Sequence, residues 1–225
     1  MLWNASTIAG YAIASSDGQA GTVNDLIFED SDWTIRWLGV GTGGWLSAGR
    51  VLVPVSVLGA PDPDTSVVPI RLTMTQIEQS PEIGADEPVT RELEARIIQY
   101  YHKTAGINPI GAPPPNAGLH RLSAMIGDTV EAADGGIGHA EDFLVDTLAW
   151  EVRFIAVDTA NWWPGEKVLI SPRSVEWIDV ARGVLQLDTD RQKVKDSPPY
   201  TLAATADGAF EEQFQTYYGI RFGRK

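Results

Sequence analysis

Residues 134–146, DGGIGHAEDFLVD, closely match residues 17–29, DGQAGTVNDLIFE, which lie 117 positions earlier in the chain. In each stretch an Asp-Gly pair precedes a β-run, and Asp-Gly tolerates the positive φ that tight hairpin turns need. Gly21 and Gly138 follow three residues after the turn glycines, where a β-bulge or a close backbone approach is expected. Both stretches therefore predict the same hairpin.

The same offset aligns the rest of the chain without a gap. Identical pairs include Leu2/Leu119, Ser6/Ser123, Gly10/Gly127, Asp25/Asp142, Trp33/Trp150, Arg36/Arg153, Trp45/Trp162, Asp62/Asp179, Glu94/Glu211, Tyr100/Tyr217 and Tyr101/Tyr218. Chance does not readily supply matched tryptophans and a matched Tyr-Tyr at one offset. We therefore expect two tandem repeats, at 1–105 and 119–225. The Pro- and Gly-rich residues 106–118, GINPIGAPPPNAG, form the linker between them.

Composition narrows the classes of function. The 225 residues carry 30 acids against 17 bases, a formal net charge of −13, with no basic run. This balance argues against direct binding of nucleic acid or of an anionic membrane surface. The absence of cysteine excludes disulfides, thiol nucleophiles and zinc–thiolate sites. With neither a signal peptide nor an apolar stretch of about 20 residues, we expect a cytoplasmic protein, with association at the periphery of a membrane complex left open.

Each repeat reads as short strands followed by helices. The clearest strands are 33–42 and 150–159, 50–54 and 167–171, and 66–72 and 183–189. Short helices follow Thr73 and Asp190 as N-caps, and closing helices are expected over 86–101 and 207–218. The predicted fold class is mainly β with α: two tandem small antiparallel β-barrels, each followed by short helices and related by a pseudo-twofold axis.

The repeats resemble the PRC-barrel family. The first carries the resemblance through DGQAGTVNDLIFE, IRWLGVGTGGW, RVLVPVSVL and IRLTMTQIEQSPEI, and the second through DGGIGHAEDFLVD, VRFIAVDTANWW, KVLISPRSV and LQLDTDRQKVKDSPPY. The family includes the cytoplasmic domain of the photosynthetic reaction-centre H subunit and a domain of a ribosome-maturation factor. It has no common catalytic residues. The resemblance implies a barrel that docks on other proteins and adjusts their assembly or electrostatics.

No group of residues has the pattern typical of a catalytic or metal-binding site. His139, Glu141 and Asp142 are close in sequence, but neighbours in a strand point to opposite faces, so only His139 and Glu141 converge. A solvated strand edge is the favoured interpretation over a metal site. His102 and His120 have neither ligand spacing nor an adjacent nucleophile. We therefore assign no catalytic residue, no metal ligand and no cofactor, and expect the chain not to be an enzyme.

Two sets of recurring residues have both a structural and a functional interpretation. Asp25/Asp142 and Arg36/Arg153 are interpreted as a cross-strand ion pair in each barrel rather than as a charged contact surface. Trp33/Trp150 is expected to plug a barrel end. The loop tryptophans Trp45, Trp162 and Trp163 pack on their own barrel or the facing repeat, or else anchor a partner protein. They are the candidate partner contacts.

Three hypotheses for function follow. The first is a non-enzymatic interaction, assembly or regulatory module, in line with the H subunit for an electron-transport or photosynthetic complex. The second is a ribosome-assembly factor whose acidic surface binds a basic ribosomal protein. The third, and least favoured, is an enzyme or small-ligand binder at the repeat interface. The partner and the oligomeric state are left open.

Overall fold

A computed structural model describes residues 2–41, 50–84, 87–108, 117–159, 167–197, 213–214 and 216–218. The chain divides into two compact units. The N unit comprises Ala5–Ala124 and Thr147–Glu151, and the C unit comprises Met1–Asn4, Met125–Asp146 and Val152–Lys225. Within these described residues, each unit has one sheet of seven strands, so the expected class, mainly β with a few short helices, is confirmed.

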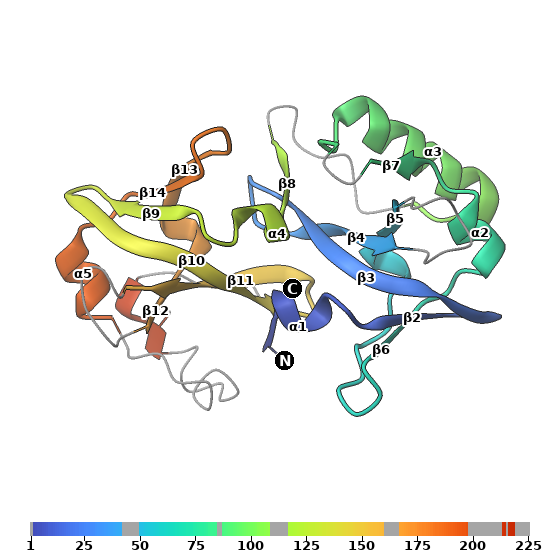
Figure 1. Ribbon diagram of the computed structural model, residues 1–225, viewed down its shortest axis with the longest axis horizontal. Helices are drawn as coiled ribbons and strands as arrows, with labels where there is room; N and C mark the ends of the chain where they lie inside the picture. Colours follow the sequence, from blue (N-terminus) through green and yellow to red (C-terminus); the bar gives the residue numbers. More distant parts are fainter. Residues whose placement is uncertain are drawn as a thin grey trace. The chain divides into compact units, whose positions relative to one another are not determined.

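The sheet of the N unit follows the order β6-β2-β3-β4-β5-β7, and β8 pairs with β3 outside this path. Its strands are β2 (Ala12–Ser15), β3 (Gly18–Glu29), β4 (Ile35–Gly41), β5 (Arg50–Pro54), β6 (Val67–Pro69), β7 (Glu82–Ile83) and β8 (Leu119–Arg121). Its helical elements are α1 (Ala5–Ile8), η1 (Val55–Val57), α2 (Met74–Glu78), α3 (Arg91–Ala105) and α4 (Leu122–Met125). Figure 1 shows yellow-green β8 beside blue β3.

The sheet of the C unit follows the order β12-β11-β10-β9-β14-β13, and β1 pairs with β10 outside this path. Its strands are β1 (Leu2–Asn4), β9 (Thr129–Ala132), β10 (Gly135–Asp146), β11 (Glu151–Asp158), β12 (Lys167–Ile170), β13 (Val175–Asp179) and β14 (Val184–Leu187). Its helical elements include η2 (Pro172–Ser174) and α5 (Arg191–Lys195), and residues 213–214 and 216–218 are also helical, within the closing helix expected over 207–218.

Both sheets differ in two respects from a closed antiparallel barrel. The pairing within the described residues is an open path in each unit, ending at β6 and β7 or at β12 and β13. Each path also contains one parallel pair, β2 with β6 and β9 with β14. The parallel pair arises because the chain passes through β3, β4 and β5 and then returns to the other side of β2, where β6 runs in the same direction as β2. In the second repeat β14 returns to β9 in the same way.

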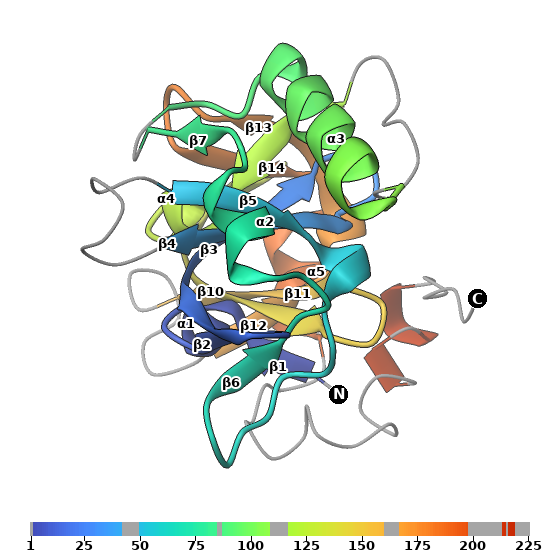
Figure 2. The ribbon, with the colours of Figure 1, turned by 90° about the vertical axis from the view of Figure 1, so that its right-hand side faces the viewer.

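The two units exchange their first strands. Leu2 and Leu119 are equivalent in the two repeats, yet β1 pairs with β10 of the second repeat and β8 pairs with β3 of the first. Leu2 packs against the C unit's core cluster, which includes Leu144, Phe154 and Phe214. The compact units therefore depart from the repeat boundaries at residues 4/5 and 124/125. Figure 2 labels β1 at the N-terminal end of the chain.

Equivalent contacts recur in both repeats, as the duplication predicts. The Asp-Gly turns are confirmed, with Asp17 accepting from the Met74 amide at 2.7 Å and Asp134 from the Arg191 amide at 2.8 Å. The register of β2 on β3 shifts just before Gly21, and that of β9 on β10 just before Gly138, which confirms the bulges. The Thr73 and Asp190 caps are confirmed at α2 and α5.

The closing helix of the first repeat starts later than expected. It begins at Arg91 with Thr90 as its N-cap, so Pro88 is outside its first turn. Its buried face includes Leu93, Ile97 and Tyr101, and the Tyr101 hydroxyl donates to the Leu52 carbonyl on β5 at 3.0 Å. Figure 2 shows α3 beside α2 and β5. Of the linker, residues 109–116 lie outside the described residues.

The exchanged strand gives the first prediction. Deleting residues 1–4 removes the pairing partner of β10 at Leu144–Asp146, although these residues lie far away in sequence. Amide hydrogen exchange at Leu144–Asp146 should become faster by about tenfold or more, since edge opening lowers local stability. The buried Leu185 on β14 is the internal control and should change much less. Unchanged exchange at Leu144–Asp146 would show that β1 contributes no pairing.

Candidate functional site

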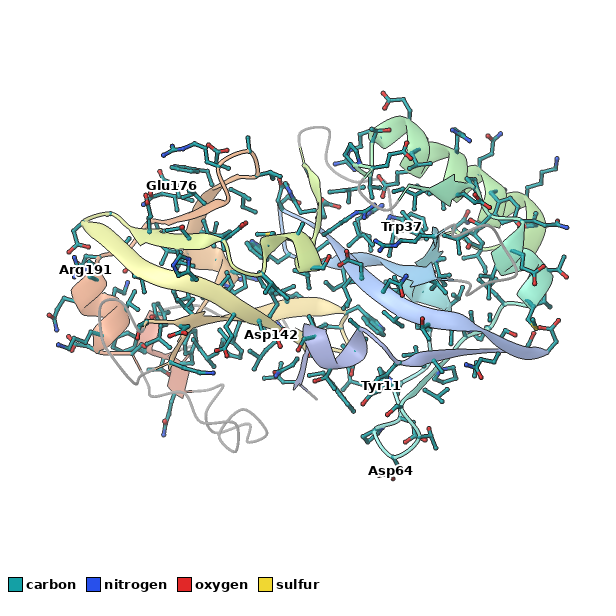
Figure 3. All side chains as sticks on the ribbon, in the orientation of Figure 1. Tyr11, Trp37, Asp64, Asp142, Glu176 and Arg191 are labelled. Carbon is teal, nitrogen blue, oxygen red and sulfur yellow. The ribbon has the colours of Figure 1, made fainter. Side chains whose placement is uncertain are left out.

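A buried charge network lies between α3 and the sheet of the N unit. Arg36 on β4 and Glu94 on α3 are only 4% and 2% exposed, and Arg36 Nε lies 2.8 Å from Glu94 Oε1. The same oxygen accepts from Trp37 Nε1 at 3.0 Å. Glu94 Oε2 pairs with Arg91 Nη1 at 2.9 Å, and Arg36 Nη1 lies 3.3 Å from Glu29 Oε2. Figure 3 labels Trp37 in this region.

Every carboxylate oxygen of this network accepts a hydrogen bond or lies in an ion pair. Besides Arg36, Glu29 accepts from the Ser31 hydroxyl at 2.6 Å, and Arg91 also donates to the Ala117 carbonyl. A general acid or base needs an accessible site for the reacting proton. We therefore interpret the network as structural: it ties α3 to β4 and to the segment that leads into β8.

The expected pairing of Asp25 with Arg36 is wrong in its partner. The register places Asp25 opposite Gly39 rather than Arg36. Asp25 instead accepts from the Leu26 amide at 2.9 Å and from both the amide and the hydroxyl of Ser123. A cross-strand ion pair does exist, between Arg36 and the last residue of β3, Glu29.

The same ion pair recurs at the equivalent positions of the second repeat. Arg153 Nη2 lies 3.2 Å from Asp146 Oδ2, and Asp146 is the counterpart of Glu29. Asp142 accepts from the Phe143 amide at 2.8 Å, as Asp25 does from Leu26. The sequence thus correctly predicted a recurring structural ion pair but assigned it to the wrong acid.

His139, Glu141 and Asp142 do not form a cluster. His139 and Glu141 face outward on β10 while Asp142 is buried, as strand alternation predicts. Glu141 pairs with Lys167 at 2.5 Å, and His139 contacts the Gly127 carbonyl. His120 on β8 has a partner that sequence reasoning missed, Asp30 at 2.9 Å. The part of the chain that the structure describes contains no group of three His, Cys, Asp or Glu residues able to hold a metal.

The tryptophans divide into two groups. Trp45, Trp162 and Trp163, the candidate partner contacts, lie outside the described residues and stay a prediction. Trp33 and Trp150 are buried in both copies, and both have a positive φ, 62° and 51°. Trp33 stacks on Phe28 with ring centroids 4.6 Å apart. A bulky residue in this backbone region is strained, so we infer that burial of the ring holds the turn between the two long strands.

Sequence reasoning missed an exposed aromatic residue on the C unit. Trp177 on the outer strand β13 is 41% exposed, and Val180 in the following turn is 62% exposed. The register places Trp177 beside Gln186, and Gln186 beside Glu131, on one face of the sheet. Leu185 and Val130 in the adjacent row are fully buried, so the Trp177 row faces solvent. The signal that could have found Trp177 was the 117-residue offset, because the equivalent residue of the first repeat is Ala60 and not an aromatic residue.

Carboxylates surround this hairpin. Glu176 is exposed on β13, as Figure 3 shows, and Asp179 ends the strand. Asp128 lies beside the turn, because a Cβ added to Gly183 would meet its Oδ1 at 2.8 Å. Partial burial raises the pKa of the Asp128 carboxyl above its ordinary value. Within the described residues this carboxylate has no hydrogen-bond or ion-pair partner.

A separate surface hollow of about 440 Å³ lies on the N unit. Its lining includes Ser56, Arg71, Ile107 and Asn108. The Arg71 guanidinium already donates to the Ser56 carbonyl at 2.7 Å, and no acid–base pair converges there among the lining residues. The hollow therefore offers no assembled catalytic chemistry.

The family model of the PRC-barrel domain matches residues 4–78, which contain β2 to β6 and α2. Residues 4–78 are thus similar to a PRC-barrel domain. No curated protein matches the chain. Within the described residues, no helix is long and apolar enough to cross a membrane.

The buried network that joins residues 4–78 to α3 gives the second prediction. Glu94→Ala should lower the free energy of unfolding of the N unit by about 3 kcal/mol, because it leaves Arg36 buried with only part of its compensation. Glu94→Gln should cost less, since it keeps an acceptor for Trp37. The matched control is Glu92→Ala on the exposed side of the same helix turn, which should cost at most about 1 kcal/mol. Urea unfolding measures all three, and equal losses for Glu92→Ala and Glu94→Ala would contradict the structural role.

Proposed function

We propose that this protein is a non-enzymatic interaction module built from two tandem PRC barrels, which assembles or regulates a protein complex. The second barrel is inferred from the aligned repeat and from the contacts that recur in it, such as the bonds of Asp17 and Asp134. The observation that carries the proposal is the exposed Trp177 on the outer strand β13 of the C unit. Exposed aromatic residues are typical of protein–protein contacts.

The proposed partner complex is of the electron-transport or photosynthetic reaction-centre type, as the resemblance to the H subunit implies. A net charge of −13 placed beside a redox protein shifts the electrostatic potential at that protein. The described residues add no competing chemistry, since neither the buried network nor the surface hollow forms a catalytic site. The proposal therefore assigns the function to surfaces.

The acidic balance favours a second candidate. Thirty acids against 17 bases suit a basic partner, and many ribosomal proteins are basic. Under this candidate the module acts in ribosome assembly by holding one such protein. The two candidates differ in the partner and share the interaction surface.

The third prediction tests the function. The full chain, used as bait after cross-linking in its native cell, should capture a defined set of proteins. Its deletion should change the assembly state of that complex on a density gradient. Membrane electron-transport subunits would support the first candidate, and pre-ribosomal particles the second. A chain that sediments alone, together with unchanged complexes in the deletion strain, would overturn the proposal.

A further inference from the structure

Within the described residues, the two repeats differ in the strand next to β6 and β14. In the second repeat, residues 175–179 form β13, a continuous strand on β14. Their counterparts, residues 58–62, keep only two isolated bridges, Leu58 with Ile70 and Asp62 with Val67. These bridges correspond to the end pairs Val175–Leu187 and Asp179–Val184 of β13. The middle of the strand has been lost in the first repeat or gained in the second.

The sequence explains the difference. Residues 58–62 read LGAPD, and Gly59 and Pro61 disfavour a strand because proline cannot donate to a ladder. Residues 175–179 read VEWID, which is rich in β-branched and aromatic residues. Within the described residues β13 pairs with β14 alone, so its other edge presents unpaired backbone groups.

Apolar side chains accompany this free edge. Trp177 and Val180 are 41% and 62% exposed, and their counterparts in the first repeat are Ala60 and Pro63. A partner segment can bind by adding to a sheet as a further strand, which needs an unpaired edge and a side-chain contact. β13 offers both, an unpaired edge and the exposed Trp177 on its solvent face. Backbone pairing supplies affinity and a side-chain contact supplies specificity.

The charges around β13 decide the occupant. Glu176, Asp179, Glu131 and Asp128 surround the strand and its turn, against Arg173 and Arg182 at the two ends. A second copy of β13 added antiparallel would bring the carboxylates of both copies together, and like charges across strands are destabilising. A strand bearing lysine or arginine instead meets this acidic surface with opposite charge.

We propose that β13 is the acceptor edge for an extended basic segment of a partner protein, which adds as an outer strand and places an apolar side chain on Trp177. The inference rests on the proposed function, because it names the surface and the chemistry of the partner that such a module requires. It also assigns the contact to the second repeat alone.

The probe is an acetylated nonapeptide of alternating valine and lysine, titrated into the full chain. Calorimetry should show saturable binding, and amide NMR shifts should be confined to residues 175–180 and their neighbours on β14. The valine–glutamate counterpart should not bind. No shift at these amides up to millimolar lysine peptide, or equal binding of both peptides, would overturn the inference.

Variants of the chain test the side-chain contact. Trp177→Ala, which installs the residue of the first repeat, should weaken the peptide by about tenfold or more, as loss of an interface anchor does. Leu148→Ala removes another exposed apolar side chain, 80% exposed on the N unit, and should change affinity less than about twofold. Equal effects of the two variants would contradict a specific contact.

Backbone pairing is tested on the peptide. Alternate amides of a strand point to the same edge. Peptides N-methylated on all the valines or on all the lysines should therefore differ in affinity by at least about tenfold. If both retain full affinity, the strand is not added by pairing. If the chain instead sediments as a dimer that Trp177→Ala dissociates, the occupant is a second copy of this chain and the inference fails.

Capture experiments distinguish failure of the β13 inference from failure of the proposed function. Cross-linking capture with the Trp177→Ala chain keeps the same partners if the module acts through another surface. The function then stands and the β13 inference is overturned. Loss of capture by both the unaltered and the altered chain overturns the function itself.

Discussion

A three-residue strand forms few backbone hydrogen bonds, so β1 and β8 depend on side chains to hold them against the long strand beside each. Around β8, Ser123 donates twice to Asp25, and His120 lies 2.9 Å from Asp30. On β1, Leu2 packs on the core cluster that contains Phe214. Each sheet is completed by residues that the other repeat encodes. Separating the repeats at the linker would therefore open an edge in both sheets, which makes the tandem chain the smallest complete form of either unit.

The two repeats have a similar sheet framework and different covering elements. The hairpin, the bulge, the helix cap and the ion pair at the end of the long strand occur in both copies. Gly59 and Pro61 interrupt the outer strand of the first copy, where the second has Glu176 and Ile178. Such substitutions leave the buried sheet unchanged while deciding whether its edge presents a ladder of donors and acceptors.

Local chemistry made the hairpins and caps predictable, because an Asp-Gly turn or an Asp190 cap acts within a few residues. The strand exchange was not predictable, since Leu2 and Leu119 have equivalent sequence surroundings and either sheet can pair with either strand. The ion pair was assigned to the wrong acid because the strand register, too, could not be predicted from the sequence. The register places Asp25 opposite Gly39, three residues from Arg36 along β4. Trp177 lies outside the strands predicted from the sequence, and its exposure follows from the place of β13 at the end of the sheet.

The two repeats separate two structural demands that conflict within one small sheet. The ion pair of Arg36 with Glu94 requires α3 to stay packed on the sheet, since a buried pair is stable only when its desolvation is compensated. A strand that accepts a partner has the opposite need, an edge that stays unpaired in water. Such an edge invites aggregation unless charge protects it, and β13 carries Glu176 and Asp179. Because these carboxylates repel another copy of the strand and attract a basic one, the same charges that keep the edge soluble also select its partner.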